Sequence, residues 1–345
     1  MEVLETNVAL VGAGPIGLEL AVALMRAGID YVHLDARQIG YTISWFAPET
    51  RFFSSNERIA IAGVPLQTPD QSKASREQYL AYLRMVVTMF DLKVRTYEPV
   101  TGIERQRDGG FMLTTQPQTG PRRYRARRVV LATGGTARPR TLGIPGETLP
   151  HVTHYLGDPH DYFRRRVVVV GGRNSAVEGA LRCYHAGADV TISYRGAEFD
   201  RERIKYWLLP EIKSLMKPGR IKSHFNTQPV EITPSHMRIR NIQDGQTHDI
   251  PADVVLLLIG YEADMSLFRM AGVELDPTTH APRFNEQTME TSVEGLYVAG
   301  TAAGGTQEKY VLFIENCHVH AERIVAALTG APAPTSAPTF ERPES

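Results

Sequence analysis

An internal repeat constrains the fold of this chain more than any other feature of the sequence. Residues 9–30 align without a gap onto residues 168–189, at an offset of 159 residues. Each copy contains an apolar run, a glycine-rich turn, a stretch with helical spacing and a second short apolar run. Gly28 and Gly187 lie where a glycine commonly ends a helix. Because an apolar run before a glycine turn suits a buried parallel strand, the repeat predicts two βαβ units.

The remaining segments predict an α/β fold with two Rossmann-like, three-layer dinucleotide-binding domains. Between the repeats we expect an irregular stretch at 38–75, a helix at 76–90, an antiparallel meander at 93–134 and a linker rich in proline and glycine at 136–150. After the second unit we expect a helix near 201–216, strands within 221–250, 254–260 and 295–300, and a helix at 312–328. The composition of the end of the chain predicts disorder over 331–345.

Composition excludes several classes of protein. The 345 residues include 38 basic and 38 acidic side chains, and this balance opposes binding to nucleic acid or to an anionic membrane. The two cysteines form no C-x-x-C motif, so we expect neither a disulfide scaffold nor a metal site. No apolar run approaches the ~20 residues that span a bilayer. We therefore expect a soluble, cytoplasmic protein.

The first glycine motif has the spacing of a dinucleotide site. Gly12 permits a tight turn, Gly14 lets backbone amides approach a pyrophosphate, and Gly17 lets the following helix pack closely. Asp35 lies 18 residues beyond Gly17, at the expected end of the second strand, where a carboxylate accepts hydrogen bonds from a ribose.

The second motif differs at two positions. Arg173 replaces the middle glycine, and Tyr194-Arg195 stands where the first copy has Asp35-Ala36. A carboxylate would repel a ribose 2′-phosphate, whereas an arginine binds it with charge-assisted hydrogen bonds. The second unit is therefore predicted to bind NADPH. The first unit is then predicted to bind FAD, since flavin is a natural hydride acceptor for NADPH.

Several strings of this sequence resemble one enzyme family. They are RFFSSNERIAIAGVPL at 51–66, VVGGRNSAVEGAL at 169–181, WLLPEI at 207–212, LIGYEADMSLFRMAGV at 258–273 and FIEN at 313–316. The chain resembles the bacillithiol disulfide reductases (bacilliredoxin reductases), a branch of the low-molecular-weight thioredoxin-reductase-like flavoproteins. The resemblance implies an FAD domain in two segments, 1–137 and 262–330, interrupted by an NADPH domain at 138–261. It also implies a homo-oligomer and a hydride passed from NADPH to FAD, then to bacillithiol disulfide or a bacilliredoxin-linked disulfide.

Two sets of cofactor-binding residues follow from the motifs and the resemblance. The FAD set is Gly12, Gly14, Pro15, Ile16, Gly17, Asp35, Ala36, Phe53, Ser54, Val100, Ala132, Thr133, Gly134, Gly300 and Thr301. The NADPH set is Gly171, Gly172, Arg173, Asn174, Ser175, Tyr194, Arg195 and Gly260.

The chain departs from the family pattern at two places. Ile16 stands where the bacillithiol branch typically has a cysteine. Three explanations are open: another thiol serves in its place, the flavin reduces its acceptor directly, or the acceptor is a different one. Cys317 is the candidate substitute thiol, because it follows FIEN near the last helix, whereas Cys183 is the weaker candidate. Thr301 stands where many relatives have an aspartate.

Three alternatives stay open. A ferredoxin- or flavodoxin-type NADP reductase would pass electrons to a small redox protein, and a flavin-binding protein without turnover would pass none. A flavin monooxygenase would use a histidine near the linker, for which His151 and His154 are candidates, whereas His318 and His320 make a poor chelate. Other side chains that could border the flavin are Trp45, Phe52, Phe53, Lys309 and Tyr310.

Overall fold

The computed structural model describes residues 3–307 and 311–332, and these form two compact units. The second unit consists of Phe46–Pro48 and Pro139–Tyr261, and the first contains the rest of the described chain. Within 3–307 and 311–332, no helix is both long and apolar enough to cross a membrane. Lys309, Tyr310 and most of the expected disordered tail lie outside the described residues.

The first unit is built on one large sheet covered by helices. Its strands are β1 (Val3–Val11), β2 (Tyr31–Leu34), β3 (Val94–Arg95), β4 (Val100–Arg105), β5 (Phe111–Thr115), β6 (Arg122–Leu131) and β17 (Leu296–Val298). Its helices are α1 (Pro15–Arg26), α2 (Tyr41–Ser44), α3 (Asn56–Ile59), α4 (Arg76–Met89), α7 (Ser266–Met270) and α8 (His318–Thr329), with 3₁₀ turns η2 (Gly300–Gly304) and η3 (Ile314–Asn316).

The sheet of the first unit has the order β3-β2-β1-β6-β5-β4, and β17 also pairs with β6. Strands β1, β2, β6 and β17 are parallel, whereas β4, β5 and β6 form the expected antiparallel meander. Leu131 of β6 is in register with Val11 of β1 and Val298 of β17, and Val11 is in register with Leu34 of β2. The residues that follow these four strands therefore meet at one edge of the sheet.

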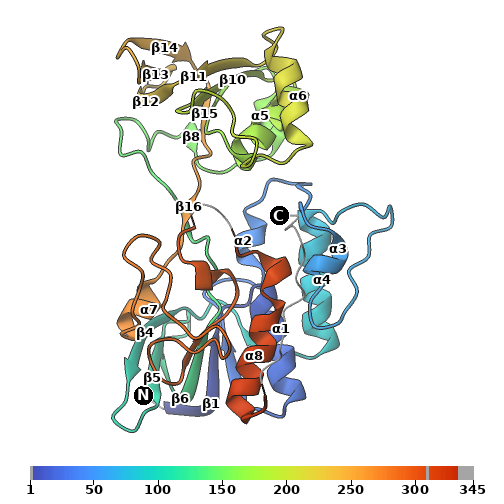
Figure 1. Cartoon of the computed structure of the whole chain (residues 1–345), viewed down its shortest axis with the longest axis vertical. Coiled ribbons are helices and arrows are strands. Elements are labelled where there is room, and N and C mark those ends of the chain that lie inside the picture. The colour runs from blue at the N-terminus through green and yellow to red at the C-terminus, as the bar shows by residue number, and fades with distance from the viewer. Residues whose placement is uncertain (1–2, 308–310, 333–345) are drawn as a thin grey trace. The chain divides into compact units, whose positions relative to one another are not determined.

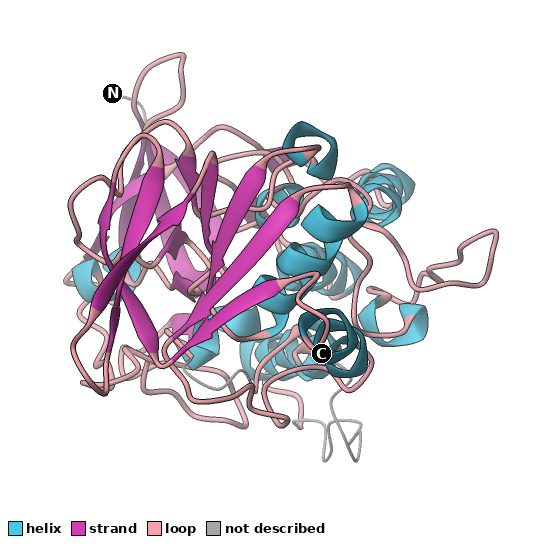
Figure 2. Cartoon of the chain, turned by 90° about the horizontal axis from the view of Figure 1, so that it is seen from above, coloured by secondary structure: helices cyan, strands magenta, loops and turns pink. Residues whose placement is uncertain are grey.

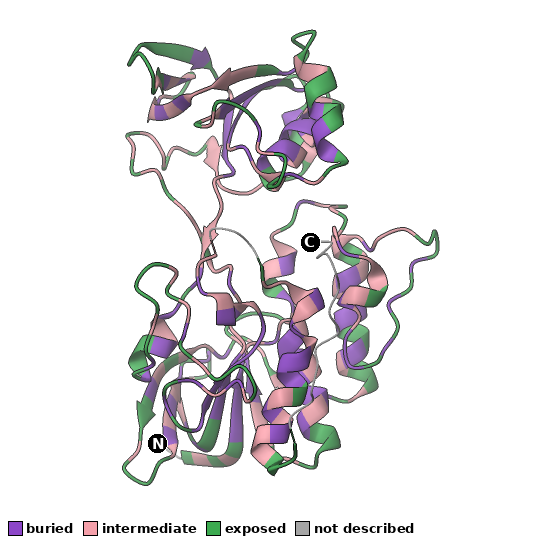
Figure 3. Cartoon of the chain, viewed as in Figure 1, coloured by how far each residue is buried: buried purple, intermediate pink, exposed green. Residues whose placement is uncertain are grey.

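Helices α1, α4 and α8 cover one face of this sheet. Helix α1 packs against both α4 and α8, and the buried colouring in Figure 3 follows their facing sides and the strands beside them. Ser75 and Gln78 start α4 with a reciprocal capping box, which satisfies two backbone amides at the helix start. Figure 2 distinguishes the strands (magenta) from the helices (cyan) by colour.

The second unit contains the other copy of the repeat. Its parallel sheet has the order β11-β10-β9-β15-β8, and a separate antiparallel sheet has the order β12-β13-β14. The strands are β8 (Val152–Thr153), β9 (Arg166–Val170), β10 (Asp189–Tyr194), β11 (Lys222–Phe225), β12 (Thr227–Ile232), β13 (His236–Asn241), β14 (Thr247–Pro251) and β15 (Val254–Leu257). The helices are the 3₁₀ turn η1 (Pro159–Tyr162), α5 (Asn174–His185) and α6 (Leu208–Met216). The predicted α/β class with two Rossmann-like units is confirmed.

Two connecting segments join the units. They pair with each other as β7 (Arg138–Pro139) and β16 (Tyr261–Glu262). Beyond β7 the proline- and glycine-rich segment folds on itself, because the Glu147 carboxylate accepts hydrogen bonds from the amides of Leu142 and Gly143, at 2.8 and 2.7 Å. The domain boundaries at 137/138 and 261/262 and the cofactor of each domain stay predictions.

Two expected helices begin later than predicted. Helix α6 starts at Leu208 rather than near residue 201, and Pro210 then lies in its first turn, where the missing proline N–H costs no helical hydrogen bond. Helix α8 starts at His318 rather than at residue 312. The side chain of Asn316 bonds the amide of Phe313 and the carbonyl of Val311, and these local bonds replace a first helical turn.

The connecting segment offers a test of its packing at two glycines. Gly146 and Gly143 both have positive φ, at 82° and 68°. A Cβ on Gly146 would lie 1.8 Å from the carbonyl oxygen of Ile232, whereas one on Gly143 would meet nothing within 4 Å. We expect Gly146→Ala to destabilise the protein by about 2 kcal/mol more than Gly143→Ala, because only the former adds an overlap to the backbone strain. Equal midpoints of thermal unfolding for the two variants would contradict this packing.

Candidate functional site: two dinucleotide-binding edges

The first glycine turn lies against the end of strand β6. Gly12 has φ +109°, and a Cβ there would lie 2.4 Å from the carbonyl oxygen of Ala132. A Cβ on Gly17 would lie 2.0 Å from the carbonyl oxygen of Gly12. Only glycine fits at either position, so the turn and the start of α1 pack directly on the sheet edge.

The space in front of this turn suits a pyrophosphate. Gly14 is the N-cap residue of α1 and has no side chain that could cap the helix. A Cβ atom added at Gly14 would meet no other atom within 4 Å. The backbone beside Gly14 is therefore open at the start of α1, and a helix N-terminus attracts an anion.

Asp35 lies beside the turn, as predicted. Its carboxylate accepts hydrogen bonds from the amide of Ala13 at 2.6 Å and from the amide of Arg37 at 2.7 Å. Burial raises the pKa of Asp35, and these two amides oppose the shift. The carboxylate is thus fixed next to the pyrophosphate position, where a ribose hydroxyl can donate to it.

A buried threonine hydroxyl at the same edge has no partner. Thr133 follows β6, and its Oγ1 is buried without a hydrogen-bond partner among the residues that the structure describes. An unpaired buried hydroxyl costs free energy, so it indicates a bound group that completes the site. The edge therefore fits FAD, and Gly12, Gly14, Asp35 and Thr133 would hold it.

Two buried histidines support this edge, and sequence reasoning missed both. His33 on β2 donates from Nε2 to the carbonyl of Gly12, at 2.9 Å, and burial lowers its pKa to about 4. His320 on α8 accepts from the amide of Gly300 through Nδ1, at 3.1 Å, and burial lowers its pKa to about 4 as well. Both imidazoles are neutral near pH 7 and fix the backbone of the predicted FAD site. No motif in the sequence signals either of them.

The positions that depart from the family pattern lie together. The side chain of Ile16 lies against Gly300, 3.3 Å from its Cβ position. Thr301 accepts a hydrogen bond from the amide of Gly135, at 2.9 Å, and so ties η2 to the segment after β6. Ala132, Thr133, Gly134, Gly300 and Thr301 thus come together with the first glycine turn, whereas Val100 begins β4 in the meander.

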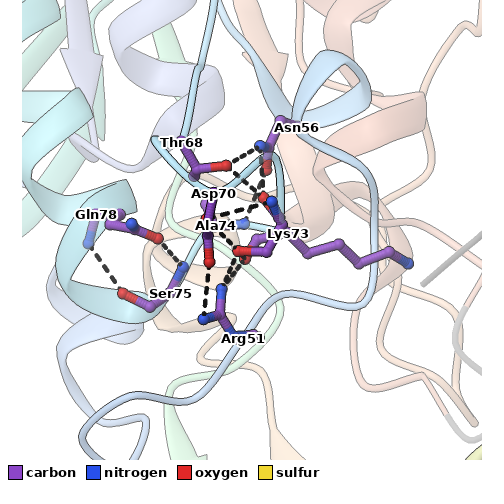
Figure 4. A network of polar contacts seen from close by, with 9 residues as sticks. Arg51, Asn56, Thr68, Asp70, Lys73, Ala74, Ser75 and Gln78 are labelled. Carbon is purple, nitrogen blue, oxygen red and sulfur yellow. Dashed lines mark hydrogen bonds and ion pairs between the residues drawn. The ribbon is translucent and has the colours of Figure 1, made fainter.

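Phe53 and Ser54 lie in the segment between α2 and α3. Asn56 holds this segment through bonds to Thr68, the carbonyl of Ser72 and the amide of Ala74 (Figure 4). The amine of Lys73 donates to the carbonyl of Phe53. The ring of Phe52 packs on Tyr79, with centroids 4.5 Å apart, so Phe52 fills the core.

The two cysteines are both buried and unpaired. Burial raises the pKa of the Cys317 thiol and raises the pKa of Cys183 to about 12. Cys317 is fully enclosed by the core of the first unit. Neither thiol is therefore a thiolate near pH 7, and a redox role for Cys317 stays a prediction that this environment opposes.

The second glycine turn carries positive charge instead of an acid. Gly171 has φ +139°, and its Cβ position lies 2.5 Å from the carbonyl oxygen of Leu258 beyond β15. The ring of Tyr194 packs on the backbone of Gly172 and Gly196, whose Cβ positions lie 2.4 and 2.5 Å from it. Arg173 caps α5 by its backbone alone.

Four arginines surround this turn. Burial and the charges of Arg203, Arg140 and Arg195 lower the pKa of Arg173. Arg140 donates its amide to the carbonyl of Gly260, at 3.0 Å, which brings Gly260 to the same place. Such a concentration of like charge at a helix start suits the phosphates of NADPH. Arg140 and Arg203 were not predicted, although Arg203 lies in the basic run that follows β10.

Comparison with known proteins identifies the class. Residues 9–300 match the family model of pyridine nucleotide-disulphide oxidoreductases, and the chain belongs to this family. It is an oxidoreductase that uses FAD and NADPH.

Within that class the chain belongs to the bacilliredoxin reductases. It is 35% identical to bacilliredoxin reductase of Bacillus subtilis over 319 residues, which cover 92% of this chain and 96% of the relative. A solved bacillithiol disulfide reductase from Bacillus cereus is also 35% identical, with a TM-score of 0.89 over 94% of this chain and 99% of that one. The resemblance found in the sequence is thus confirmed.

Other matches are more distant. A ferredoxin–NADP reductase of Ignicoccus hospitalis is 27% identical over 84% of this chain and 88% of its own length. A flavin-containing monooxygenase of Stenotrophomonas maltophilia has a TM-score of 0.73, but at 20% identity over 95% of this chain and 99% of that one it shows the fold alone.

Thr133 allows a test of the FAD edge. We expect Thr133→Val to weaken FAD binding by about 10-fold, because it removes a hydrogen bond to the cofactor. The same change should leave the flavin-free protein as stable or slightly more stable, because it removes an unpaired buried hydroxyl. Flavin titration and thermal unfolding of both forms measure the two effects. Unchanged FAD affinity would show that Thr133 does not contact the cofactor.

Arg195 allows a test of the second turn. We expect Arg195→Ala to lose about 10- to 100-fold in NADPH affinity, since a charge-assisted hydrogen bond contributes about 1.5 to 3 kcal/mol. NADH affinity should change little, because NADH lacks the 2′-phosphate. Arg220→Ala, at an exposed arginine of the same unit, serves as the control. Equal losses for both nucleotides in titrations of Arg195→Ala would rule out the 2′-phosphate contact.

Proposed function

We propose that this chain is an NADPH-dependent reductase of bacillithiol disulfide or of a bacilliredoxin-linked disulfide. The similarity to bacilliredoxin reductase over nearly the whole length of both chains carries the proposal. When bound, FAD would accept a hydride from NADPH and return two electrons to a disulfide. The cytoplasm is the proposed location, since both cysteines are unpaired, and the homo-oligomer that the resemblance implies stays a prediction.

The residues of the chain would serve mainly to bind and align the two nucleotides. Asp35 would hold a ribose of FAD, and the N-terminus of α1 would face its pyrophosphate. Arg195 and Arg173 would select NADPH by its phosphates. No side-chain acid or base is needed for hydride transfer, so the protein contributes alignment.

We further propose that no protein thiol relays electrons to the acceptor. Ile16 cannot attack a disulfide, and a thiol with a raised pKa is a poor nucleophile at neutral pH. Both cysteines of the chain are in that state. Electrons would then pass to the acceptor disulfide without a mixed disulfide on the protein.

A panel of acceptors tests the substrate. Under anaerobic conditions we expect NADPH oxidation to depend on bacillithiol disulfide and to be slow with ferredoxin or flavodoxin. In a parallel aerobic assay, oxygen uptake coupled to an organic substrate would indicate a monooxygenase. Faster turnover with ferredoxin than with the disulfide would contradict the proposed acceptor.

Cysteine variants test the relay separately. We expect Cys317→Ser and Cys183→Ser to keep wild-type turnover with the disulfide, because neither thiol is needed. Circular dichroism and flavin content control for folding, since both side chains are buried. A loss of disulfide turnover in correctly folded, flavin-loaded Cys317→Ser would restore Cys317 as the substitute thiol.

A further inference from the structure

His318, the first residue of α8, lies between two hydrogen-bond acceptors. Its Nδ1 is 2.7 Å from a carboxylate oxygen of Glu19 on α1. Its Nε2 is 2.8 Å from the carbonyl oxygen of Arg58 in α3. A backbone carbonyl cannot donate a hydrogen bond, and neither can an ionised carboxylate. Both bonds therefore form only when both ring nitrogens carry a proton, which makes His318 an imidazolium.

Glu19 makes a second hydrogen bond that positions its carboxylate. Its other carboxylate oxygen accepts a hydrogen bond from the amide of Ala62, at 3.0 Å. With this amide on one oxygen and the imidazolium on the other, the carboxylate has a donor on each side. One ion pair thus holds two backbone groups, the Arg58 carbonyl and the Ala62 amide.

Neighbouring elements place charges of both signs around His318. Glu19 raises the pKa of His318 by a hydrogen bond and by its charge, against the effect of burial, and Glu322 on α8 adds to this increase. Arg58 forms an ion pair with the buried Glu315, at 3.8 Å. Among the described residues, four more titratable groups are linked electrostatically to this pair, namely Tyr79 and Tyr82 on α4, Cys317, and His320 on α8. Arg323 on α8 acts on His320.

Besides the Arg58–Glu315 pair, a further charged group contacts this segment: the guanidinium of Arg26 on α1 donates to the carbonyl of Ala62, at 3.1 Å. Arginine stays protonated at neutral pH. The tyrosine contacts of the segment are neutral. Tyr79 donates to the carbonyl of Ile59, at 2.8 Å, and Tyr82 donates to the carbonyl of Val64, at 2.7 Å. The amide of Ile61 donates to the hydroxyl of Tyr82, at 2.7 Å. Tyrosine hydroxyls keep their protons up to about pH 10, so these contacts do not change at neutral pH. Among these groups, the imidazole of His318 is the one expected to lose a proton between pH 6 and 9.

We propose that His318 is a positioning residue, held as an imidazolium by Glu19, that clamps residues 58–62 to helices α1 and α8. The clamped residues follow Phe53 and Ser54, which are predicted to contact FAD. Loss of one ring proton removes a donor from either the Arg58 carbonyl or Glu19. The clamp is therefore complete at low pH and opens as the pH rises through the folded-state pKa of His318.

The protonation state is measured directly. In ¹⁵N-histidine-labelled holoenzyme, we expect both ring nitrogens of His318 to carry protons at pH 7.5, and comparison with His318→Gln assigns the signals. In Glu19→Gln the same ring should lose its second proton at lower pH, because the carboxylate charge is gone. A neutral His318 ring in the wild type at pH 7.5 would overturn the proposal.

Hydrogen exchange of the Ala62 amide measures the clamp. After correction for the intrinsic rate, we expect protection in the wild-type holoenzyme to fall between pH 6.5 and 9. In His318→Gln, protection of the Ala62 amide should be about 10-fold lower at pH 6.5, because one charge-assisted hydrogen bond is lost. It should also be independent of pH, because the titrating ring is gone. A side chain that only fills space would not give this pH dependence.

An exposed histidine of the second unit provides the control. His185→Gln removes an exposed histidine that pairs with Glu211 at 2.6 Å in the second unit, and it should keep the wild-type profile. If His318→Gln does not fold, Glu19→Gln serves in its place and should shift the fall in protection to lower pH. Protection of Ala62 that is independent of pH in the wild type would overturn the clamp.

Discussion

The contact between the first glycine turn and the end of β6 is the constraint on which the first unit depends. The Cβ position of Gly12 lies 2.4 Å from the carbonyl of Ala132, so a side chain there would force the two strand ends apart. The register of β1, β2, β6 and β17 brings their ends to the same edge. His33 and His320 then fix the turn and the Gly300 backbone with neutral, buried hydrogen bonds.

A difference in charge distinguishes the two copies of the repeat. The first edge fixes a carboxylate, Asp35, beside the helix start, and the second surrounds its helix start with arginines such as Arg173 and Arg195. The chain as a whole has no net charge, so composition conceals this contrast. The same backbone motif thus supports two nucleotides whose ribose ends differ in charge.

The sequence predicted most of the fold, because the repeat, the glycine turns and the meander are local patterns. It misplaced the start of α8, where Asn316 side-chain bonds replace a helical turn. It could not predict His33, His320 or the His318–Glu19 pair, since these depend on residues 20 to 299 positions apart that only the folded chain brings together. For the same reason the burial of Cys317 could not be read from its position after FIEN.

The central claim is that one edge holds FAD and the other selects NADPH. The rate at which each reduced nucleotide bleaches the flavin absorbance, measured anaerobically by stopped flow at equal concentration below saturation, tests it most directly. We predict bleaching by NADPH at least ~10-fold faster than by NADH, as one charge-assisted contact to the 2′-phosphate would give. Equal rates with the two nucleotides, or no bleaching by NADPH, would contradict the account.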